Sequence, residues 1–335
     1  MERRMLGRSG IGIAPLVLGS NVFGWTADEP TSFALLDAFV DAGFNCVDTA
    51  DVYSRWLPGR KGGESETVIG NWLAQGGGRR DRLVVATKVG MDMGGDAKGL
   101  SRRHIVQAVE DSLRRLRTDH IDLYQSHADD LDVPLEETLA AYGELIQAGK
   151  VRAIGASNYS PSRLTEALDL AERQGLPRYE SLQPWYNLYD RGDFEGGSEA
   201  VCLERGVGVI SYLGLASGFL SGKYRREQDL EGKPRGYRVA NYMNERGFRI
   251  LGALDRVAEE LAATPAQVAL AWLMQRPAIT APIASATSLE QLGDIMHAAD
   301  LRLSGEQVAL LDTASAQAPG TAVAGADQRP GGARS

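Results

Sequence analysis

The chain has 335 residues, of which 43% are hydrophobic and 24% are charged, so its composition argues against disorder of the whole chain. This length corresponds to one large domain or two ordinary ones. The formal net charge is −8 and no run of Lys and Arg exceeds two residues, which disfavours nucleic acid as the main partner.

Cysteine usage and hydropathy restrict the compartment. The two cysteines, Cys46 and Cys202, are too few for a disulfide framework, and neither a CxxC nor an HExxH motif predicts a metal site. The first ten residues contain no apolar signal region, and no 18-residue apolar stretch occurs. We therefore expect a cytoplasmic protein, a monomer or a homo-oligomer, without a membrane segment.

Eight short apolar runs in chain order are predicted as strands, at residues 16–18, 44–48, 83–88, 121–126, 153–156, 181–183, 207–212 and 279–283. Segments of helical periodicity lie between them, at 31–42, 65–73, 101–116, 134–148, 161–173, 264–275 and from 288 onward. Strands that are apolar on both faces are typical of parallel sheets. Their alternation with helices predicts an α/β fold, a (β/α)8 TIM barrel.

Three segments exceed what a minimal barrel requires. Residues 2–14 are predicted to form an N-terminal β-hairpin that turns at residues 8–10, and residues 213–250 form a long Gly- and Arg-rich loop after the seventh strand. The C-terminal extension, residues 318–335, is rich in Ala, Gly and Pro and is predicted to be a disordered tail. Residues 1–317 are thus expected to form a single barrel domain.

A doubly wound dinucleotide-binding fold is the alternative architecture. It predicts a GxGxxG turn between a strand and a helix, and the sequence contains neither this motif nor a GxxxxGK[ST] loop. The barrel is therefore the better interpretation.

Three successive strands of the predicted barrel end in chemically active side chains. Asp48 ends the second strand and is followed by Tyr53, Lys88 ends the third, and His127 ends the fourth. Because active sites of such barrels gather at the carboxyl ends of the strands, these four residues are expected to converge. An ammonium near Tyr53 would lower the tyrosine pKa, a carboxylate would keep the lysine charged, and a histidine would hydrogen-bond a carbonyl oxygen.

Each of these residues alone has an ordinary structural interpretation, and their conjunction is what favours chemistry. One alternative chemistry is that of an isomerase or aldolase in which Lys88 forms a Schiff base with a ketone. Asp48 beside Lys88 would keep the amine protonated, which argues against it.

The segments that carry these residues resemble the aldo-keto reductase superfamily in residue type, order and spacing. The matching stretches are GFNCVDTADVY at 43–53, ATK at 86–88, DLYQSH at 122–127, GKVRAIGASNY at 149–159, QPWYN at 183–187 and LASGFLSGKY at 215–224. The resemblance covers about residues 1–316 and is closest to long-chain bacterial members related to the channel β-subunit branch. It implies an oxidoreductase acting on CH–OH donors that uses NADP(H), with NAD(H) as the alternative, to reduce an aldehyde or ketone.

The resemblance also implies roles for individual residues. Tyr53 would be the general acid, supported by Lys88 and Asp48, while His127 would orient the substrate carbonyl. The implied cofactor-binding residues are Gly19, Ser20, Asn21, Asp48, Ser157, Asn158, Gln183, Tyr212 (stacked on the nicotinamide), Leu213, Leu215, Gly218, Lys223, Ala284, Ser285, Thr287, Gln291 and Asp294. The candidate substrate-contacting residues are Trp25, Tyr53, Trp56 and His127.

Two departures from the family pattern concern the cofactor. Leu213-Gly214-Leu215 replaces the usual Ser-Pro-Leu, and the 282–288 segment lacks the cation that usually grips the 2′-phosphate. We therefore expect a narrowed preference for NADPH over NADH. The resemblance leaves a second function open, a cofactor-binding regulatory or sensor subunit with slow turnover.

Overall fold

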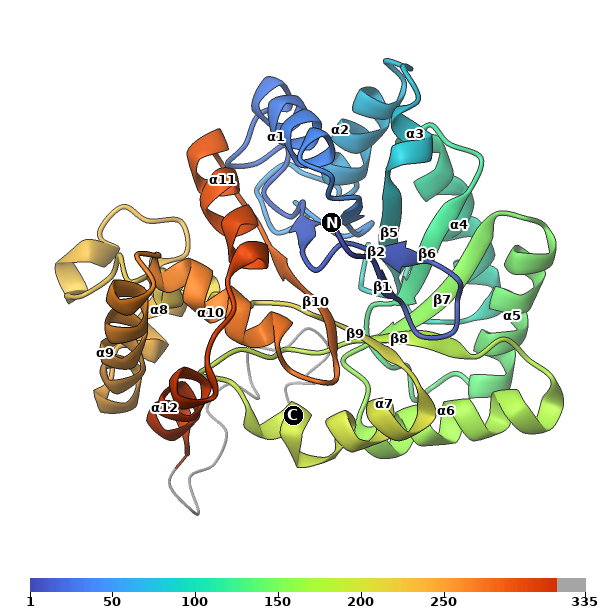
Figure 1. The fold of residues 1–335 in the computed structure, drawn as a ribbon. Helices are drawn as coiled ribbons and strands as arrows, with labels where there is room; N and C mark the ends of the chain where they lie inside the picture. The colour runs from blue at the N-terminus through green and yellow to red at the C-terminus, as the bar shows by residue number, and fades with distance from the viewer. Residues whose placement is uncertain (318–335) are drawn as a thin grey trace.

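The computed structural model describes residues 1–317, so the expectation for residues 318–335 lies outside the described chain. Eight parallel strands close into a barrel in the order β10-β3-β4-β5-β6-β7-β8-β9 (Figure 1). The strands are β3 (Val17–Gly19), β4 (Cys46–Asp48), β5 (Val84–Val89), β6 (Ile121–Ser126), β7 (Val151–Ser157), β8 (Tyr179–Gln183), β9 (Gly208–Ser211) and β10 (Ile279–Ala284). The predicted (β/α)8 barrel is confirmed.

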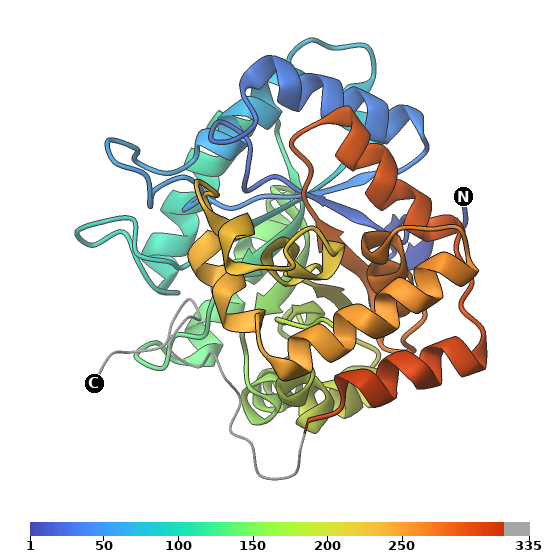
Figure 2. The same cartoon turned by 90° about the vertical axis from the view of Figure 1, so that its left-hand side faces the viewer.

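Helices surround these strands (Figure 2). They are α1 (Glu29–Asp41), α2 (Glu64–Leu73), α3 (Arg79–Arg82), α4 (Arg102–Leu116), α5 (Leu135–Gln147), α6 (Pro161–Gln174), α7 (Glu199–Arg205), α8 (Gly236–Val239), α9 (Glu245–Glu260), α10 (Pro265–Met274), α11 (Leu289–His297) and α12 (Gly305–Ser315). Side-chain caps explain several of the starts: Ser101, Ser160 and Thr264 each accept a hydrogen bond from a backbone N–H three residues ahead.

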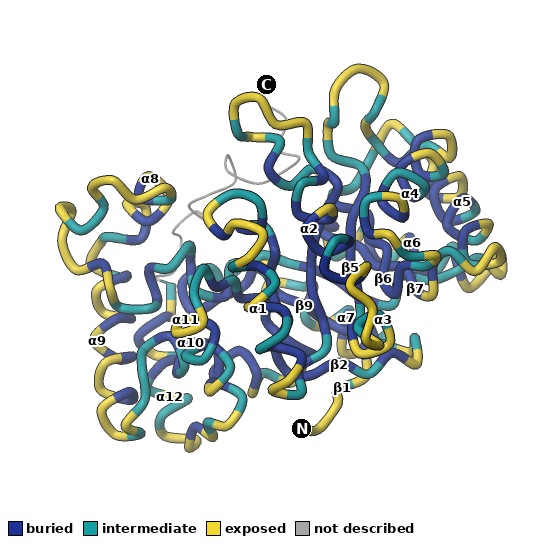
Figure 3. The backbone as a smooth tube through the Cα atoms, turned by 90° about the horizontal axis from the view of Figure 1, so that it is seen from above, coloured by how far each residue is buried: buried dark blue, intermediate teal, exposed yellow. Residues whose placement is uncertain are grey.

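The predicted N-terminal hairpin is confirmed and covers one end of the barrel. Strands β1 (Arg4–Met5) and β2 (Gly12–Ile13) pair antiparallel, and Leu6, Ile11 and Ile13 pack into an apolar cluster with residues of the barrel strands. Hydrogen bonds reach the start of β8 through Glu180 and the start of β10 through the Ile279 and Thr280 carbonyls. Figure 3 shows the buried strands at the centre of the molecule and exposed residues on the outer helices and loops. The hairpin thus closes the amino-terminal end of the barrel.

The segment after β9 differs in one respect from its prediction. It contains the short helices η2 (Ala216–Ser221), η3 (Glu227–Leu230), α8 and η4 (Ala240–Tyr242), as a long connection. However, α9 already begins at Glu245, after Asn244 caps it, so the insertion ends at residue 244 rather than 250. The buried face of α9, with Ile250, Leu254 and Val257, packs against α10 and α12. Sequence periodicity predicts such a face but not the helices that it contacts.

Two features are absent from residues 1–317. No helix in this part of the chain has the length and apolarity needed to cross a bilayer. Nor does this part contain a group of three or more His, Cys, Asp or Glu side chains placed to hold a metal ion.

Candidate active site

The strand register brings the four predicted residues to the carboxyl end of the barrel. Asp48 ends β4 and pairs with Gly19 of β3 and with Ala86 of β5, while Lys88 pairs with Gln125 of β6. His127 directly follows β6, and its N–H donates to the Val89 carbonyl oxygen.

Lys88 is fully buried, and its ammonium donates three hydrogen bonds. The acceptors are Asp48 Oδ2 at 2.6 Å, the Thr49 carbonyl oxygen at 2.8 Å and the Tyr53 hydroxyl at 3.0 Å. Three acceptors satisfy the three protons of an ammonium, so the buried charge is both paired and hydrogen-bonded. The structure therefore brings Asp48, Tyr53 and Lys88 into direct contact, as predicted.

The direction of the Tyr53 pKa differs from the sequence-based expectation. The pKa of Tyr53 is raised well above its ordinary value, because its enclosed hydroxyl loses water and lies beside the Asp48 carboxylate. The hydroxyl donates to Asp48 Oδ2 at 3.2 Å, which favours the neutral phenol. Burial and the Asp48 carboxylate therefore raise the pKa of Tyr53 more than the Lys88 ammonium lowers it, and the Tyr53 hydroxyl stays protonated in the resting site.

Burial lowers the pKa of Lys88, and the neighbouring carboxylates, Asp48 first, oppose that shift. The same burial, together with the Lys88 charge, lowers the pKa of His127 well below its ordinary value. His127 is therefore neutral near pH 7. Its ring lies edge-on to Tyr53 with centroids 6.1 Å apart, and its buried Nδ1 has no partner among the described residues.

A second hydrogen-bond network adjoins Asp48 and connects four predicted cofactor residues. Gln183 Nε2 donates to Asp48 Oδ1 at 2.8 Å, and the Ser157 hydroxyl donates to the Gln183 carbonyl oxygen. Asn158, held in a left-handed conformation (φ 60°), donates to the His127 carbonyl oxygen and accepts from the Tyr212 hydroxyl at 2.7 Å. These side chains fix one another beside Asp48.

Gln125 is a member of this network that the sequence analysis did not single out. It faces the barrel interior on β6, where its Nε2 lies 3.4 Å from Asp48 Oδ1 and its Oε1 accepts from Gln183 at 3.3 Å. The motif DLYQSH contains the residue, but strand alternation alone does not distinguish a buried glutamine that serves the site from one that only fills the barrel.

The sequence analysis also missed a buried acidic pair behind Lys88. Glu66 on α2 is fully buried, where it accepts hydrogen bonds from Thr87 and Arg115 at 2.6 Å each. Asp51 is 2% exposed, and burial and the Glu66 charge raise its pKa to about 8. In the sequence, Glu66 cannot be told from an ordinary exposed acid in a first helical turn.

The raised pKa of Asp51 predicts a pH dependence of stability. The folded chain keeps the Asp51 proton up to about pH 8, whereas the unfolded chain releases it near 3.8. The stabilisation from this group is complete below pH 3.8 and is lost as the pH rises to 8. Relative to the wild type, Asp51→Asn should gain unfolding free energy over this window, by at most about 1.4 kcal/mol per pH unit.

Urea denaturation between pH 5 and 9 measures this difference. Asp96→Asn is the matched control, since the Asp96 side chain is 90% exposed and its substitution should give a pH-independent change. A pH-independent difference for Asp51→Asn as well would contradict the assignment.

The predicted residues at the end of β3 and directly after it have different partners, and Asn21 hydrogen-bonds with Ser285 directly after β10. Asn21 Oδ1 accepts this hydrogen bond from Ser285 at 2.9 Å. The Ser20 hydroxyl is buried, where it donates to the Asp48 carbonyl oxygen and contacts Ser65. Gly19 allows β3 to approach Ser285, because a Cβ there would lie 2.6 Å from its hydroxyl. Ser20 and Gly19 thus maintain the strand packing.

The loop after β9 has an unusual backbone that involves the predicted residues Leu213, Leu215, Gly218 and Lys223. Leu213, Ala216, Ser217 and Gly218 all have left-handed φ angles, and three of these four residues are not glycine. Within this loop the Ala216 and Gly218 N–H groups donate to the Leu213 and Leu215 carbonyl oxygens, which holds the turns in place. A Cβ on Gly218 would lie 3.7 Å from the Lys223 ammonium, so a cation lies beside this loop.

The residues expected near the adenosine part of the cofactor begin at Ala284, the last residue of β10. Several of their side chains form hydrogen bonds within the same segment. Gln291 Oε1 accepts from the Thr287 backbone N–H and hydroxyl, and Ser288 caps α11. Asp294 accepts from Thr264 and Gln267 at the start of α10, so its side chain is engaged by that helix start.

An aromatic wall leads from Tyr53 to the surface. Tyr53 contacts Trp56 and Trp56 contacts Trp25, with ring centroids 6.0 and 5.9 Å apart. Trp56 is 50% exposed, which is unusual for so large an apolar side chain. The predicted substrate residues Trp25, Tyr53, Trp56 and His127 therefore lie together.

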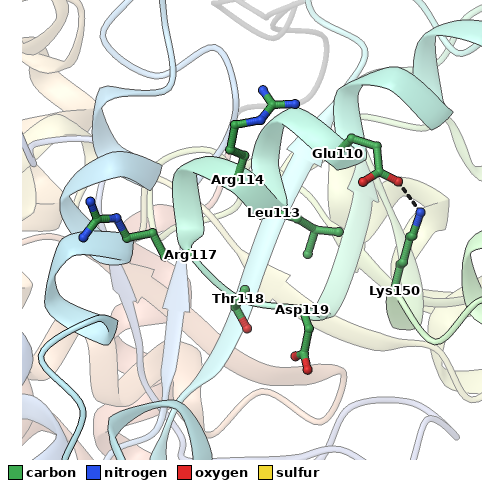
Figure 4. A pocket seen from close by; sticks show the side chains of 7 residues that line it. All are labelled: Glu110, Leu113, Arg114, Arg117, Thr118, Asp119 and Lys150. Carbon is green, nitrogen blue, oxygen red and sulfur yellow. Dashed lines mark hydrogen bonds and ion pairs between the residues drawn. The ribbon is translucent and has the colours of Figure 1, made fainter.

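A shallow surface hollow lies at the other end of the barrel (Figure 4). It is lined by Glu110, Leu113, Arg114, Arg117, Thr118, Asp119 and Lys150. Asp119 and Lys150 immediately precede β6 and β7, and Lys150 is paired with Glu110. None of the predicted site residues lines this hollow.

Comparisons with known proteins extend over almost the whole barrel. Residues 15–316 match the family model described as the aldo/keto reductase family. The chain is 36% identical to the uncharacterized oxidoreductase YrpG of Bacillus subtilis, over 93% of this chain and 95% of the relative. It is 34% identical to a probable voltage-gated potassium channel subunit beta of Oryza sativa (90% and 92% covered) and 31% identical to L-glyceraldehyde 3-phosphate reductase of Escherichia coli O157:H7 (93% and 92%).

Proposed function

This chain belongs to the aldo-keto reductase family, and from that premise we propose that it is an NAD(P)H-dependent oxidoreductase that reduces an aldehyde or ketone to the alcohol. The observation that carries the proposal is the position of the Tyr53 hydroxyl. It lies 3.0 Å from the Lys88 ammonium and 3.2 Å from the Asp48 carboxylate, beside His127, at the end of the barrel where such folds perform chemistry.

Tyr53 is proposed to be the proton donor. Its raised pKa keeps the hydroxyl protonated at neutral pH, so the proton is available when charge develops on the carbonyl oxygen. As that proton leaves, the phenolate forms within hydrogen-bond distance of the buried ammonium. Lys88 therefore stabilises the Tyr53 phenolate more than the resting phenol. An interaction that is stronger in the transition state than in the ground state accelerates the proton transfer.

His127 and Asp48 are proposed to position the reacting groups. A neutral His127 can donate one ring N–H to the carbonyl oxygen, because burial and Lys88 disfavour its cationic form. Asp48 holds the ammonium at 2.6 Å, and Gln183 satisfies the other carboxylate oxygen. Thus each charged group of the site is oriented before substrate arrives.

A bound reduced nicotinamide would supply the hydride to the carbonyl carbon. Ser157, Asn158, Gln183 and Tyr212 would hold its ring next to Asp48, and the left-handed loop with Lys223 would bind its pyrophosphate. Side chains at Asn21, Ser285, Thr287 and Gln291 would contact the adenosine end.

The first test is oxidation of NADPH, followed at 340 nm, by the full-length protein with a panel of aldehydes and ketones. Turnover that yields the stoichiometric alcohol is expected. Binding of NADPH without turnover of any carbonyl compound would instead favour the second candidate, a regulatory or sensor subunit. That candidate is motivated by the similarity to the probable channel β subunit.

Cofactor choice gives a separate prediction. No Lys or Arg occurs in residues 282–288, so backbone N–H groups at the start of α11 and polar side chains would have to receive a 2′-phosphate. We expect NADPH to bind more tightly than NADH by less than about tenfold, or 1.4 kcal/mol. Titration of the apoprotein by tryptophan fluorescence measures both dissociation constants. A hundredfold preference would mean that a cation outside this segment binds the phosphate.

A further inference from the structure

Arg235 occupies an unusual position in the long connection after β9. Its guanidinium lies over the ring of Trp25, 5.5 Å from the centroid. Trp25 contacts Trp56, which in turn contacts Tyr53. The cation therefore lies on the same aromatic wall that leads from the surface to the proposed proton donor.

The Arg235 guanidinium lacks a partner for one of its donor groups. Its Nη2 is buried and makes no hydrogen bond to any described residue, and no ion pair within residues 1–317 involves Arg235. In contrast, Arg225 and Arg226 of the same connection are paired with Asp255 and Asp229. A buried donor without an acceptor is destabilising, and a bound anion beside Nη2 would supply the acceptor.

The surroundings of Arg235 favour an anion. The charged neighbour that acts on it most is another cation, Arg238, and the groups that favour its charged form are the hydroxyls of Tyr237, Tyr224 and Tyr53. Burial and Arg238 together lower the pKa of Arg235, and the main groups that oppose the shift are tyrosine hydroxyls and not carboxylates. Arg235 thus belongs to a group of cations in this connection, with Lys223, Lys233 and Arg238, that favours an anion even in a chain with a net charge of −8.

We infer that Arg235 binds an anionic group of the substrate, so that the preferred substrates are carbonyl compounds that also carry a carboxylate or a phosphate. A guanidinium presents paired N–H donors that match either group, and stacking on Trp25 orients that fork. This inference rests on the proposed reductase function and specifies its substrate class. Arg235 is a specificity-determining residue, because its contact is to the anionic group and not to the carbonyl.

The cofactor phosphates are the competing source of such an anion. Arg235 lies over Trp25, which precedes α1, although its charge also acts on Lys223, whose pKa is lowered by burial, Lys233 and Arg235. The wall that holds Arg235 ends at Tyr53, where a carbonyl oxygen would accept its proton. These positions favour the substrate as the source.

Arg235→Gln tests the inference with pairs of substrates that differ only in charge. The pairs are 4-carboxybenzaldehyde with methyl 4-formylbenzoate, and glycolaldehyde phosphate with glycolaldehyde. The wild type should prefer one or both anions over their neutral partners. The substitution should reduce kcat/KM for the preferred anion by about 10- to 100-fold, mainly through KM, because a charge-assisted pair is lost.

The same variant should change kcat/KM for neutral aldehydes, and the dissociation constant for NADPH, by less than about threefold. Arg238→Gln is the matched control, since it removes the same charge from an exposed neighbour whose Nε contacts Tyr237. Its effect should be small because exposed charges are screened by salt. A result in which Arg238→Gln reduces anion turnover as much as Arg235→Gln would overturn the direct contact.

Three further outcomes also contradict the inference. Equal losses for charged and neutral aldehydes would make Arg235 structural, and weakened NADPH binding would assign it to the cofactor. If the wild type reduces neutral aldehydes without preferring an anion, the reductase function stands and the inference fails. If it reduces nothing, the proposed function fails. Calorimetric binding of terephthalate to the NADPH complex, abolished by Arg235→Gln or unaffected by it, then decides the anion site alone.

Discussion

Tyr53→Phe is expected to lower kcat for carbonyl reduction by about 10²- to 10⁴-fold, the usual contribution of a positioned general acid. The substitution removes the hydroxyl that lies 3.0 Å from Lys88 and 3.2 Å from Asp48 while it keeps the ring against Trp56. Ground-state contacts of the ring are retained, so KM should change little. Steady-state kinetics with the best aldehyde of the panel measures both parameters.

NADPH binding separates loss of the acid from loss of the fold. The dissociation constant of Tyr53→Phe for NADPH should stay within about threefold of the wild type, because the lost group is proposed to act on the substrate oxygen. If the variant keeps the wild-type kcat, Tyr53 is not the proton donor. The ion pair between Lys88 and Asp48 does not depend on that outcome.

Lys88→Met should abolish activity and also destabilise the fold by about 3–5 kcal/mol, because it leaves a buried carboxylate without its counter-charge. Lys88 is fully buried and Asp48 is 2% exposed, so water cannot replace the lost ammonium at low energetic cost. Chemical denaturation at pH 7 measures the free energy of unfolding, and NADPH oxidation measures the activity.

Two companion variants isolate the charge effect. Lys150→Met removes the same ammonium from an exposed pair with Glu110 and should change stability by about 0–1 kcal/mol. The double variant Asp48→Asn/Lys88→Met removes both buried charges, so it should recover much of the lost stability and none of the activity. If the double variant is as unstable as Lys88→Met, packing and not charge explains the loss.

The positions of Asp48, Lys88 and His127 could be predicted from the sequence, because each ends or directly follows an apolar run and a parallel barrel brings all such ends together. The direction of the Tyr53 pKa shift could not be predicted in this way. Spacing along the chain indicates that an ammonium is near, but only coordinates show that Asp48 Oδ2 is also within 3.2 Å and that the hydroxyl is enclosed.

Two other features needed tertiary contacts. Glu66 is buried only because Thr87 and Arg115 lie against α2 and supply its hydrogen bonds. Arg235 is one of several cations in a segment that also contains Glu227, Asp229 and Glu231, so its sequence context predicts an ion pair. The fold instead places its guanidinium over Trp25, and within residues 1–317 it forms no ion pair with those acids. Which charges remain unpaired is a property of packing and is not encoded in local composition.

The hairpin of β1 and β2 covers one end of this barrel with apolar side chains, so that the two ends differ in their access to solvent. Leu6, Ile11 and Ile13 close the amino-terminal opening, so water and solutes reach the interior from the other side. Substitutions in this apolar plug can then tune how long the protein survives heating, and substitutions along the Trp25–Trp56 wall can tune what it acts on. The hairpin cluster and the Trp25–Trp56 wall lie at opposite ends of the barrel, so substitutions at the hairpin can change stability without contacting the wall.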